Sequence, residues 1–444
     1  MYVTAVPPLA EGVIKMGYDF PEALQIEVTN RCNFNCRMCI RRVWGAKPTD
    51  LNLDLYKKIA RSSFQFLERL ILYGLGEPII HPEFLEMLEI ARANLPGESQ
   101  ITISTNGSLL NPKLAEKVLK VGIDSLSFSI DTLDAVKLRR IRRGSKPDVI
   151  MGNFEYVAKA KRKSVREFRL GVEAVVMKEN YKDLPNLIEC LAQRGVDYIL
   201  VSHVVPYTEE IFRESIYITL SKLPFEVIKP SLKYGWGLIR EAALETLSRA
   251  YGIGEECNYA EMVRRFWRDA GERGYWINLP LLFDSKDKID MIDQVEEVFH
   301  RSRMVAHEYQ VDLRLPSLFP DAKERSCPYV DRDTMVVRAD GMVAPCLEFM
   351  YQHPMYVNTH LKIVYPVFFG NLLRDEVGKV WNREAYVRFR EVRRDLAKNI
   401  PWCGDCVYST LRCFFTKTNE SDCYSNKPGC SECIYSVNLA QCNI

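Results

Sequence analysis

Three cysteines near the start of the chain have the spacing of iron–sulfur ligands. They are Cys32, Cys36 and Cys39, in the arrangement C-x3-C-x2-C. Thiolate sulfur is the usual ligand of [4Fe–4S] iron, so three thiolates on one loop can hold three corners of the cube. The fourth iron then lacks a protein ligand, and an open coordination position separates catalytic metal sites from closed structural ones, as it does for zinc. The triplet therefore predicts a cluster that reacts with a bound molecule.

The triplet directly follows Leu24–Thr29, an apolar run whose alternation is typical of a strand. A C-x3-C-x-hydrophobic-C loop after a first strand resembles the signature of the radical SAM superfamily. In that family the open iron binds the amino and carboxylate groups of S-adenosylmethionine (SAM). The resemblance implies that Met38, in the hydrophobic slot, packs near the adenine. Closely spaced cysteines also bind other metals, and a zinc knuckle is the alternative for this loop.

Polar residues and glycines follow the later strand-like segments. Within the radical SAM resemblance they are the candidate SAM-binding residues: Gly76 and Glu77 in a G-x-G-E-P element, Asn106, the Ser129/Asp131 pair and Arg143. Glycine lets a backbone approach a ligand closely, and residues two apart on a strand share one face. The resemblance implies that Glu77 binds the SAM ammonium, Ser129 and Asp131 the ribose, and Arg143 the carboxylate. Each residue alone could equally cap a strand end, and their order along the chain favours SAM.

Strand-like and helix-like segments alternate from residue 24 to about 205, which predicts parallel strands covered by helices. The expected strands are Leu24–Thr29, Arg69–Tyr73, Gln100–Ser104, Ser125–Ile130, Phe168–Met177 and Tyr198–His203. The expected helices are Leu53–Phe66, Pro82–Ala93, Pro112–Val121, Val149–Lys163 and Leu184–Arg194. Six such units fit the α/β fold of radical SAM proteins, a partial (β/α)6 barrel of TIM type. Functional loops in such barrels follow the carboxyl ends of the strands.

The last third of the chain is rich in cysteine. The pair Cys327 and Cys346 flanks a hairpin-like segment in a C-x13-G-x4-C pattern, and Cys403, Cys406 and Cys413 follow as C-x2-C-x6-C. This is similar to the SPASM extension of radical SAM enzymes, which implies two auxiliary [4Fe–4S] clusters. Lys417 stands where the family pattern has its next cysteine. The candidate ligands number nine for eight places: Cys327, Cys346, Cys403, Cys406, Cys413, Cys423, Cys430, Cys433 and Cys442.

A zinc ribbon is the alternative for this cysteine-rich region. Paired C-x2-C knuckles are its common pattern, and Cys403-x2-Cys406 with Cys430-x2-Cys433 would supply them. That arrangement leaves five nearby cysteines without a role. Two further cysteines, Cys190 and Cys257, belong to no cluster pattern and are interpreted as inert thiols, although Cys257 could return a hydrogen atom to a product radical.

Four regions are expected along the chain. They are a lead-in (1–20), the radical SAM partial barrel (21–225), a helical specificity segment (226–325) and the SPASM-like auxiliary cluster domain (326–444). The helical segment has patterns over Ile239–Tyr251, Tyr259–Glu272 and Met291–His307. The lead-in is too short for the separate leader-binding domain that many peptide-modifying enzymes carry.

Composition and charge exclude several classes of protein. A net charge of +2 provides no excess positive field to attract nucleic acid. No stretch approaches the eighteen or so apolar residues of a membrane span, and the N-terminus lacks the layout of a signal peptide. Fourteen cysteines without secretion signals suit a reducing compartment, where metal ligation is favoured over disulfides. We therefore expect a cytoplasmic protein.

Two stretches narrow the resemblance within the superfamily. Ser202–Glu210 and Asp422–Cys433, with the ending Ala440-Gln-Cys442, are similar to the tungsten cofactor oxidoreductase radical SAM maturases. The resemblance implies that the protein cleaves SAM reductively and acts in maturation of a tungstopterin oxidoreductase or its cofactor, with electrons from a ferredoxin or flavodoxin. Two alternatives remain. One is a peptide- or protein-modifying SPASM maturase of the sulfatase-maturing or ribosomal-peptide type. The other is a non-enzymatic iron–sulfur or zinc protein.

Overall fold

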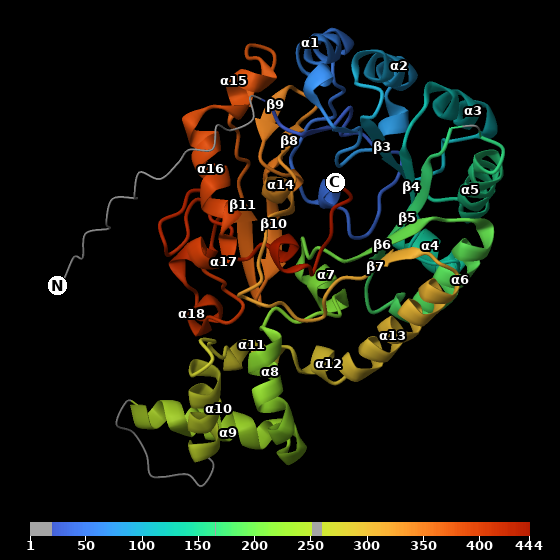
Figure 1. Ribbon diagram of the computed structural model, residues 1–444. Coiled ribbons are helices and arrows are strands. Elements are labelled where there is room, and N and C mark those ends of the chain that lie inside the picture. The colour runs from blue at the N-terminus through green and yellow to red at the C-terminus, as the bar shows by residue number, and fades with distance from the viewer. Residues whose placement is uncertain (1–19, 165, 251–259) are drawn as a thin grey trace.

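Parallel strands with helices on their outer side build the first part of the molecule, as the alternating sequence pattern predicts. The computed structural model describes residues 20–164, 166–250 and 260–444. Neighbouring strands of the barrel follow one another in chain order: β1 (Ala23–Ile26), β2 (Arg69–Ile71), β3 (Gln100–Thr105), β4 (Ser125–Ser129), β5 (Arg169–Val176), β6 (Tyr198–His203) and β7 (Asp312–Arg314). The curved sheet with its ring of helices is the expected partial barrel (Figure 1).

Amphipathic helices cover the outside of the curved sheet (Figure 1). They are α1 (Leu53–Ser63), α2 (Phe84–Asn94), α3 (Pro112–Val121), α4 (Ala135–Ile141), α5 (Pro147–Lys161), α6 (Leu184–Arg194) and α13 (Ile292–Glu308). Local signals fix several ends: the Asn52 side chain accepts hydrogen bonds from the first backbone amides of α1, and left-handed Gly122 and Gly195 end α3 and α6. α3 and α6 begin and end where the sequence predicts.

The strand period of two separates an apolar outer face from a polar inner face. In and just after β1, Leu24, Ile26 and Val28 join the hydrophobic core beneath the helices. The alternate residues Gln25 and Glu27 are equally buried but face the barrel interior, where Gln25 donates to the Tyr73 carbonyl at 3.2 Å. The barrel therefore encloses polar side chains rather than a purely apolar core.

A helical segment follows β6 and leads back to the barrel. It comprises α7 (Glu209–Glu214), α8 (Lys222–Ile228), α9 (Trp236–Ala250), α10 (Ala260–Gly271), α11 (Leu279–Asp284) and α12 (Lys286–Ile289). The helices α9, α10 and α13 correspond to the three helical patterns of the sequence. Cys257 lies outside the described residues. Within the described ranges, no helix has the length and apolar content needed to cross a bilayer.

The C-terminal cysteine-rich segment is continuous with the barrel sheet. Its elements are α14 (Pro328–Asp331), β8 (Thr334–Val337), β9 (Met342–Ala344), β10 (His353–Val357), β11 (His360–Val364), β12 (Gly370–Asn371), α15 (Val377–Trp381), α16 (Glu384–Arg394), α17 (Leu396–Asn399) and α18 (Val407–Thr410). β8 and β9 form the expected hairpin. β8 also pairs in parallel with β1, from Ala23↔Thr334 to Ile26↔Val337, and extends the sheet to ten strands.

The C-terminal tail enters the barrel interior. The chain end lies at the centre of the ring of strands (Figure 1). Tyr73 on the β2 side donates to the Asn443 carbonyl at 2.6 Å, and the Asn443 side chain donates to Glu173 of β5 at 2.8 Å. Ile444 packs in a small core that includes Ile71 and Tyr73. Residues at the end of the sequence thus form part of the wall of the barrel chamber.

Candidate active site and auxiliary cysteine groups

The cysteine triplet lies on the loop that leaves β1, at the carboxyl end of the strands. All three thiols are partly buried, and they lie close together: besides burial, Cys39 raises the pKa of Cys32 and of Cys36, and Cys32 raises that of Cys36. The loop is held by backbone bonds to the turn after α4: the Asn35 amide donates to the Arg143 carbonyl and the Arg37 amide to the Ile141 carbonyl, both at 2.8 Å. One loop therefore presents three thiols to the mouth of the barrel.

Burial disfavours the thiolate at these positions. It raises the pKa of Cys36 to about 12, opposed by the positive charge of Arg142. Burial also raises the pKa of Cys39, opposed by Arg41 and Arg142. Iron binds the thiolate, so cluster loading must release protons from these groups. Two nearby guanidinium groups offset the negative charge that three thiolates would bring.

The Gly76-Glu77 element closes the loop from the β2 side. A Cβ at Gly76 would lie 2.2 Å from the Thr29 carbonyl oxygen and 2.6 Å from that of Arg31, so glycine is required for this close approach. The buried Glu77 carboxyl accepts from Thr105 Oγ1 and from the Asn106 amide, both at 2.7 Å. Burial raises the pKa of Glu77 to about 7. Glu77 joins the loops after β2 and β3 in this structure.

Asn106 and Ser129 lie at the strand ends that the sequence predicts. Asn106 Nδ2 donates to Asn33 Oδ1 at 2.8 Å and approaches the Cys32 sulfur at 3.8 Å, so the side chain touches the cysteine loop. Ser129 ends β4 and is half-buried. Met38 packs against a small core that includes Ile141, Met177 and Val204.

Asp131 and Arg143 differ in burial and in their partners. Asp131 is buried, and both of its oxygens are taken by Arg142, at 2.7 and 2.8 Å, while Oδ1 also accepts from the Val175 amide. Asp131 thus makes a bidentate ion pair in this structure, and its contact with the ribose stays a prediction. Arg143 is exposed, whereas its neighbour Arg142 is buried and electrostatically coupled to Cys36. The sequence shows the arginine-rich segment 139–143, but only the structure shows that Arg142 is its buried arginine.

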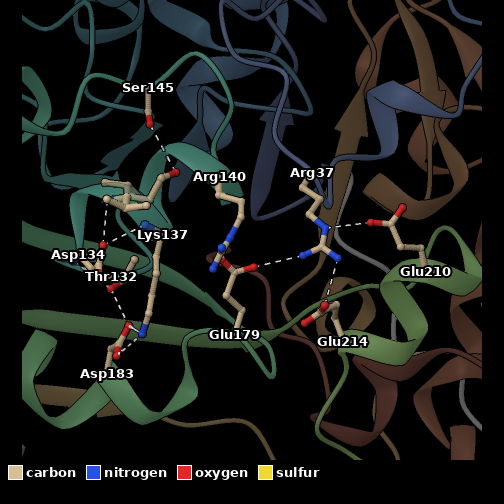
Figure 2. A network of polar contacts seen from close by, with 12 residues as sticks. Arg37, Thr132, Asp134, Lys137, Arg140, Ser145, Glu179, Asp183, Glu210 and Glu214 are labelled. Atoms are coloured by element: carbon tan, nitrogen blue, oxygen red, sulfur yellow. Dashed lines mark hydrogen bonds and ion pairs between the residues drawn. The ribbon is translucent and has the colours of Figure 1, made fainter.

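Arg37, inside the triplet itself, anchors the cysteine loop to the far side of the barrel mouth. Its guanidinium binds Glu179 at 3.1 Å and both Glu210 and Glu214 of α7 at 3.0 Å. Figure 2 shows the three carboxylates around Arg37, with Arg140 on the other side of Glu179. Sequence reasoning missed these ion pairs because the three carboxylates lie more than 140 residues from Arg37 along the chain.

Five of the C-terminal cysteines line one cavity. They are Cys327, Cys346, Cys430, Cys433 and Cys442. The pKa of Cys346 is raised by burial and by the thiols of Cys327, Cys433 and Cys430. Arg393, a fully buried guanidinium, donates from Nε to the Cys430 sulfur at 3.2 Å. Cys442 reaches the cavity from the tail and approaches Tyr329 Oη at 3.7 Å.

The remaining four cysteines form a second group, whose members range from the buried Cys403 to the exposed Cys423. Cys406 and Cys413 raise the pKa of Cys423, after the larger effects of burial and Asp422. The Cys406 amide donates to the Cys403 carbonyl at 3.2 Å, so these two share one turn. Cys423 is exposed, unlike every other cysteine of the described residues.

These two groups do not match the pairing of a zinc ribbon. Cys430 and Cys433 share their cavity with Cys327, Cys346 and Cys442, and neither Cys403 nor Cys406 lines it. In the part of the chain that the structure describes, no three His, Cys, Asp or Glu side chains converge on a point that would hold a single metal ion.

The barrel chamber contains a carboxylate that the sequence did not single out. Glu173 of β5 accepts from Ser127 Oγ and from Asn443 Nδ2 through Oε1, and it makes no ion pair within the described residues. After the larger effect of burial, its negative charge raises the pKa of Tyr73, Cys442 and Arg142. Glu173 thus lies between the cysteine loop and the tail. The only sequence signal was an acidic residue in the interior of a mostly apolar strand.

Comparison with family models agrees with this geometry. Residues 26–191 match the radical SAM superfamily, and residues 327–407 match the SPASM iron–sulfur cluster-binding domain. The chain is a radical SAM enzyme with a SPASM domain. The first match covers the barrel up to α6 and includes the triplet. The second begins at Cys327 and ends just after Cys406.

Among the curated relatives are proteins that align over nearly the whole chain and others that align over about half of it or less. The chain is 28% identical over 430 residues to the "Tungsten-containing aldehyde ferredoxin oxidoreductase cofactor-modifying protein" of Pyrococcus furiosus, covering 95% of this chain and 97% of that protein. It is 30% identical over 186 residues to a GTP 3′,8-cyclase of Marinobacter nauticus, covering 41% of this chain and 53% of the cyclase.

Solved structures share the fold. The chain superposes on Streptococcus suis SuiB bound to S-adenosylmethionine with a TM-score of 0.50 at 14% identity, covering 84% of this chain and 68% of SuiB. SuiB bound to its precursor peptide SuiA gives the same TM-score over 89% of this chain and 74% of SuiB. At this identity the likeness establishes the architecture alone.

Proposed function

We propose that this enzyme cleaves SAM at the Cys32/Cys36/Cys39 site and uses the product in maturation of the pterin cofactor of a tungsten oxidoreductase. When bound there, a [4Fe–4S] cluster with SAM supplies a one-electron cleavage that yields methionine and a 5′-deoxyadenosyl radical. The observation that carries the proposal is the alignment over 97% of a protein named as cofactor-modifying for such an oxidoreductase.

The chain's own residues would hold and orient these groups. The triplet would ligate three irons and leave one open for SAM. Arg142 is the buried cation beside the cysteines, and its Nη1 has no hydrogen-bond acceptor among the described residues, so we assign it the SAM carboxylate in place of Arg143. The Gly76 backbone, Asn106, Ser129 and Met38 complete the proposed SAM site. Glu77 and Asp131 then act by positioning the loops and Arg142.

We assign the two C-terminal groups to two auxiliary clusters. The first would be held by Cys327, Cys346, Cys430 and Cys433, whose thiols are mutual electrostatic neighbours. The second would be held by Cys403, Cys406, Cys413 and Cys423. This leaves Cys442 as the ninth, uncommitted thiol in the first cavity. A ferredoxin or flavodoxin in the cytoplasm is the electron donor we propose.

The interior of the barrel supports a polar small-molecule substrate. Gln25, Tyr73, Ser127 and Glu173 face it, and the tail closes one side through Asn443. A pterin has several N–H donors and carbonyl acceptors for such a chamber, and Glu173 is an acceptor without a cation partner among the described residues. A peptide substrate, the alternative, would have to enter past the tail.

The test is an anaerobic incubation of reduced, reconstituted enzyme with SAM and pterin cofactor released from a tungsten oxidoreductase. We expect substrate-dependent 5′-deoxyadenosine and a mass change of the pterin. Incubation with deuterium-labelled pterin should transfer deuterium to 5′-deoxyadenosine. A mass change confined to the oxidoreductase polypeptide, with the pterin unchanged, would replace this proposal with the peptide-modifying alternative.

A further inference from the structure

The turns that carry the second cysteine group also carry an exposed apolar surface. Its four side chains are Tyr408 (61% exposed), Leu411 (63%), Phe414 (73%) and Tyr424 (60%), and we call them the aromatic surface. Single exposed apolar residues are ordinary, but four of them on the turns around one group of thiols indicate a contact site for another molecule.

The residues of the aromatic surface are chain neighbours of the thiols of that group. Phe414 directly follows Cys413, and Tyr424 directly follows the exposed Cys423. The Cys413 and Leu411 amides both donate to the Tyr408 carbonyl, at 3.2 and 3.1 Å, which folds these residues into one turn. A protein bound here would lie next to the cysteines themselves. Because electron transfer slows steeply with distance, this is where an external redox protein could exchange electrons with a cluster.

Cationic side chains lie on the same segment as the aromatic surface, and Lys417 Nζ is 5.8 Å from the centre of the Phe414 ring. Arg412, Lys417 and Lys427 are exposed, and none of them makes an ion pair within the described residues. The nearby acidic residues are partly used: Asp422 is buried and accepts from Asn426 and the Tyr424 amide, and Glu420 accepts from Thr418. Such a field attracts an acidic partner and accelerates its association.

We propose that the aromatic surface docks a small acidic one-electron carrier protein of the ferredoxin or flavodoxin type. The inference rests on the proposed cluster held by Cys403, Cys406, Cys413 and Cys423. In the exchange the reduced carrier loses one electron and the oxidised cluster gains one, and no bond forms or breaks. Aromatic side chains supply the desolvated centre of the interface, and Arg412, Lys417 and Lys427 form its charged rim.

The experiment uses the full, iron-loaded enzyme and a recombinant acidic ferredoxin as the probe. Binding is measured by biolayer interferometry, and electron transfer from reduced ferredoxin by stopped-flow absorbance. Phe414→Ser combined with Tyr424→Ser should weaken binding at least about tenfold, as loss of central aromatic residues does. Lys417→Glu should lower the association rate and its dependence on ionic strength. Phe66→Ser, which removes an exposed aromatic ring just after α1, far along the chain from the second cysteine group, should change neither.

Reduction by dithionite separates this inference from the cluster assignment. If the double variant keeps the iron content and dithionite reduction of the parent enzyme, the second cluster is intact and any loss with ferredoxin belongs to docking. Unchanged ferredoxin affinity and transfer rate in the double variant and in Lys417→Glu would overturn the inference. It would equally fail if the double variant lost binding to a cofactor-free tungsten oxidoreductase while keeping its affinity for ferredoxin. Absence of iron from the second group in the parent enzyme would instead refute the cluster assignment.

Discussion

Glu27 is a fully buried carboxyl group whose pKa burial raises to about 7. Its hydrogen-bond partners are the Leu75 amide at 3.0 Å, the Ala339 amide at 3.4 Å and Tyr351 Oη. It thereby connects β1 to the loop after β2 and to the SPASM segment. The ordinary pKa of this carboxyl group is 4.5. Between pH 4.5 and about pH 7, Glu27 therefore keeps its proton in the folded protein but has released it in the unfolded chain.

The stability that Glu27 contributes should therefore be complete below pH 4.5 and lost as the pH rises through about 7. The shift corresponds to a loss on the order of 3 kcal/mol. Glu27→Gln cannot ionise, so its melting temperature should rise relative to wild type as the pH increases from 5 to 8. Thermal melts of both proteins across that range measure the difference. A difference that stays constant with pH would contradict the raised pKa.

The ninth thiol gives a second prediction at the residue scale. Cys442 sits on the tail beside Tyr329, whereas Cys430 accepts from buried Arg393. Three reconstituted clusters hold about twelve irons. We expect Cys442→Ala to retain that content and Cys430→Ala to fall toward about eight. Iron and sulfide analysis decides this, and the opposite pattern would place Cys442 among the ligands instead of Cys430.

At the scale of elements, Arg37 links the cysteine loop to α7 and to the loop after β5. Arg37→Met would leave Glu179, Glu210 and Glu214 without their shared cation. Because the site is partly buried, we expect a loss of about 3 kcal/mol of stability and faster release of iron from the first cluster. The matched control is Arg140→Met, which removes an exposed cation from Glu179 alone and should cost within about 1 kcal/mol. Equal losses of stability in the two variants would show that the three ion pairs of Arg37 contribute no more than the single ion pair of Arg140.

The loop after β2 lies against the loop after β1, and at Gly76 the two backbones approach each other closely. Gly76→Ala places a Cβ 2.2 Å from a backbone oxygen, which cannot move without displacing the Thr29–Arg31 segment. We expect a lower melting temperature and poor incorporation of the first cluster. Gly45→Ala adds the same methyl group where no atom lies within 4 Å, and it should behave as wild type. Normal iron content in Gly76→Ala would refute the close contact.

Across the whole molecule, local patterns predict the elements and distant pairing decides how they join. The strand Tyr198–His203 and the helices Pro112–Val121 and Leu184–Arg194 follow from periodicity and end signals, and the structure confirms their bounds. No local pattern predicts that β8 pairs with β1 across more than 300 residues, or that the tail enters the barrel. Both depend on tertiary contacts, which periodicity does not encode.

The candidate site shows the same division. The order of Cys32, Gly76, Asn106 and Ser129 after successive strands is enough to predict that they meet at one edge of the sheet. Which arginine faces the cysteines is not predictable in this way, because Arg142 and Arg143 are chemically identical neighbours and only packing buries one of them. Nine cysteines predict two groups, but their assignment requires the cavity that five of them share.

The most direct test of the central claim is the product of SAM under reducing, anaerobic conditions. Iron-loaded enzyme with dithionite and SAM should form 5′-deoxyadenosine and methionine, measured by liquid chromatography and mass spectrometry, even slowly without substrate. Cys36→Ala should abolish this, and Cys190→Ala, which alters a thiol on α6 away from the cluster groups, should leave it intact. Methyl transfer from SAM without 5′-deoxyadenosine, or full activity in Cys36→Ala, would contradict the account.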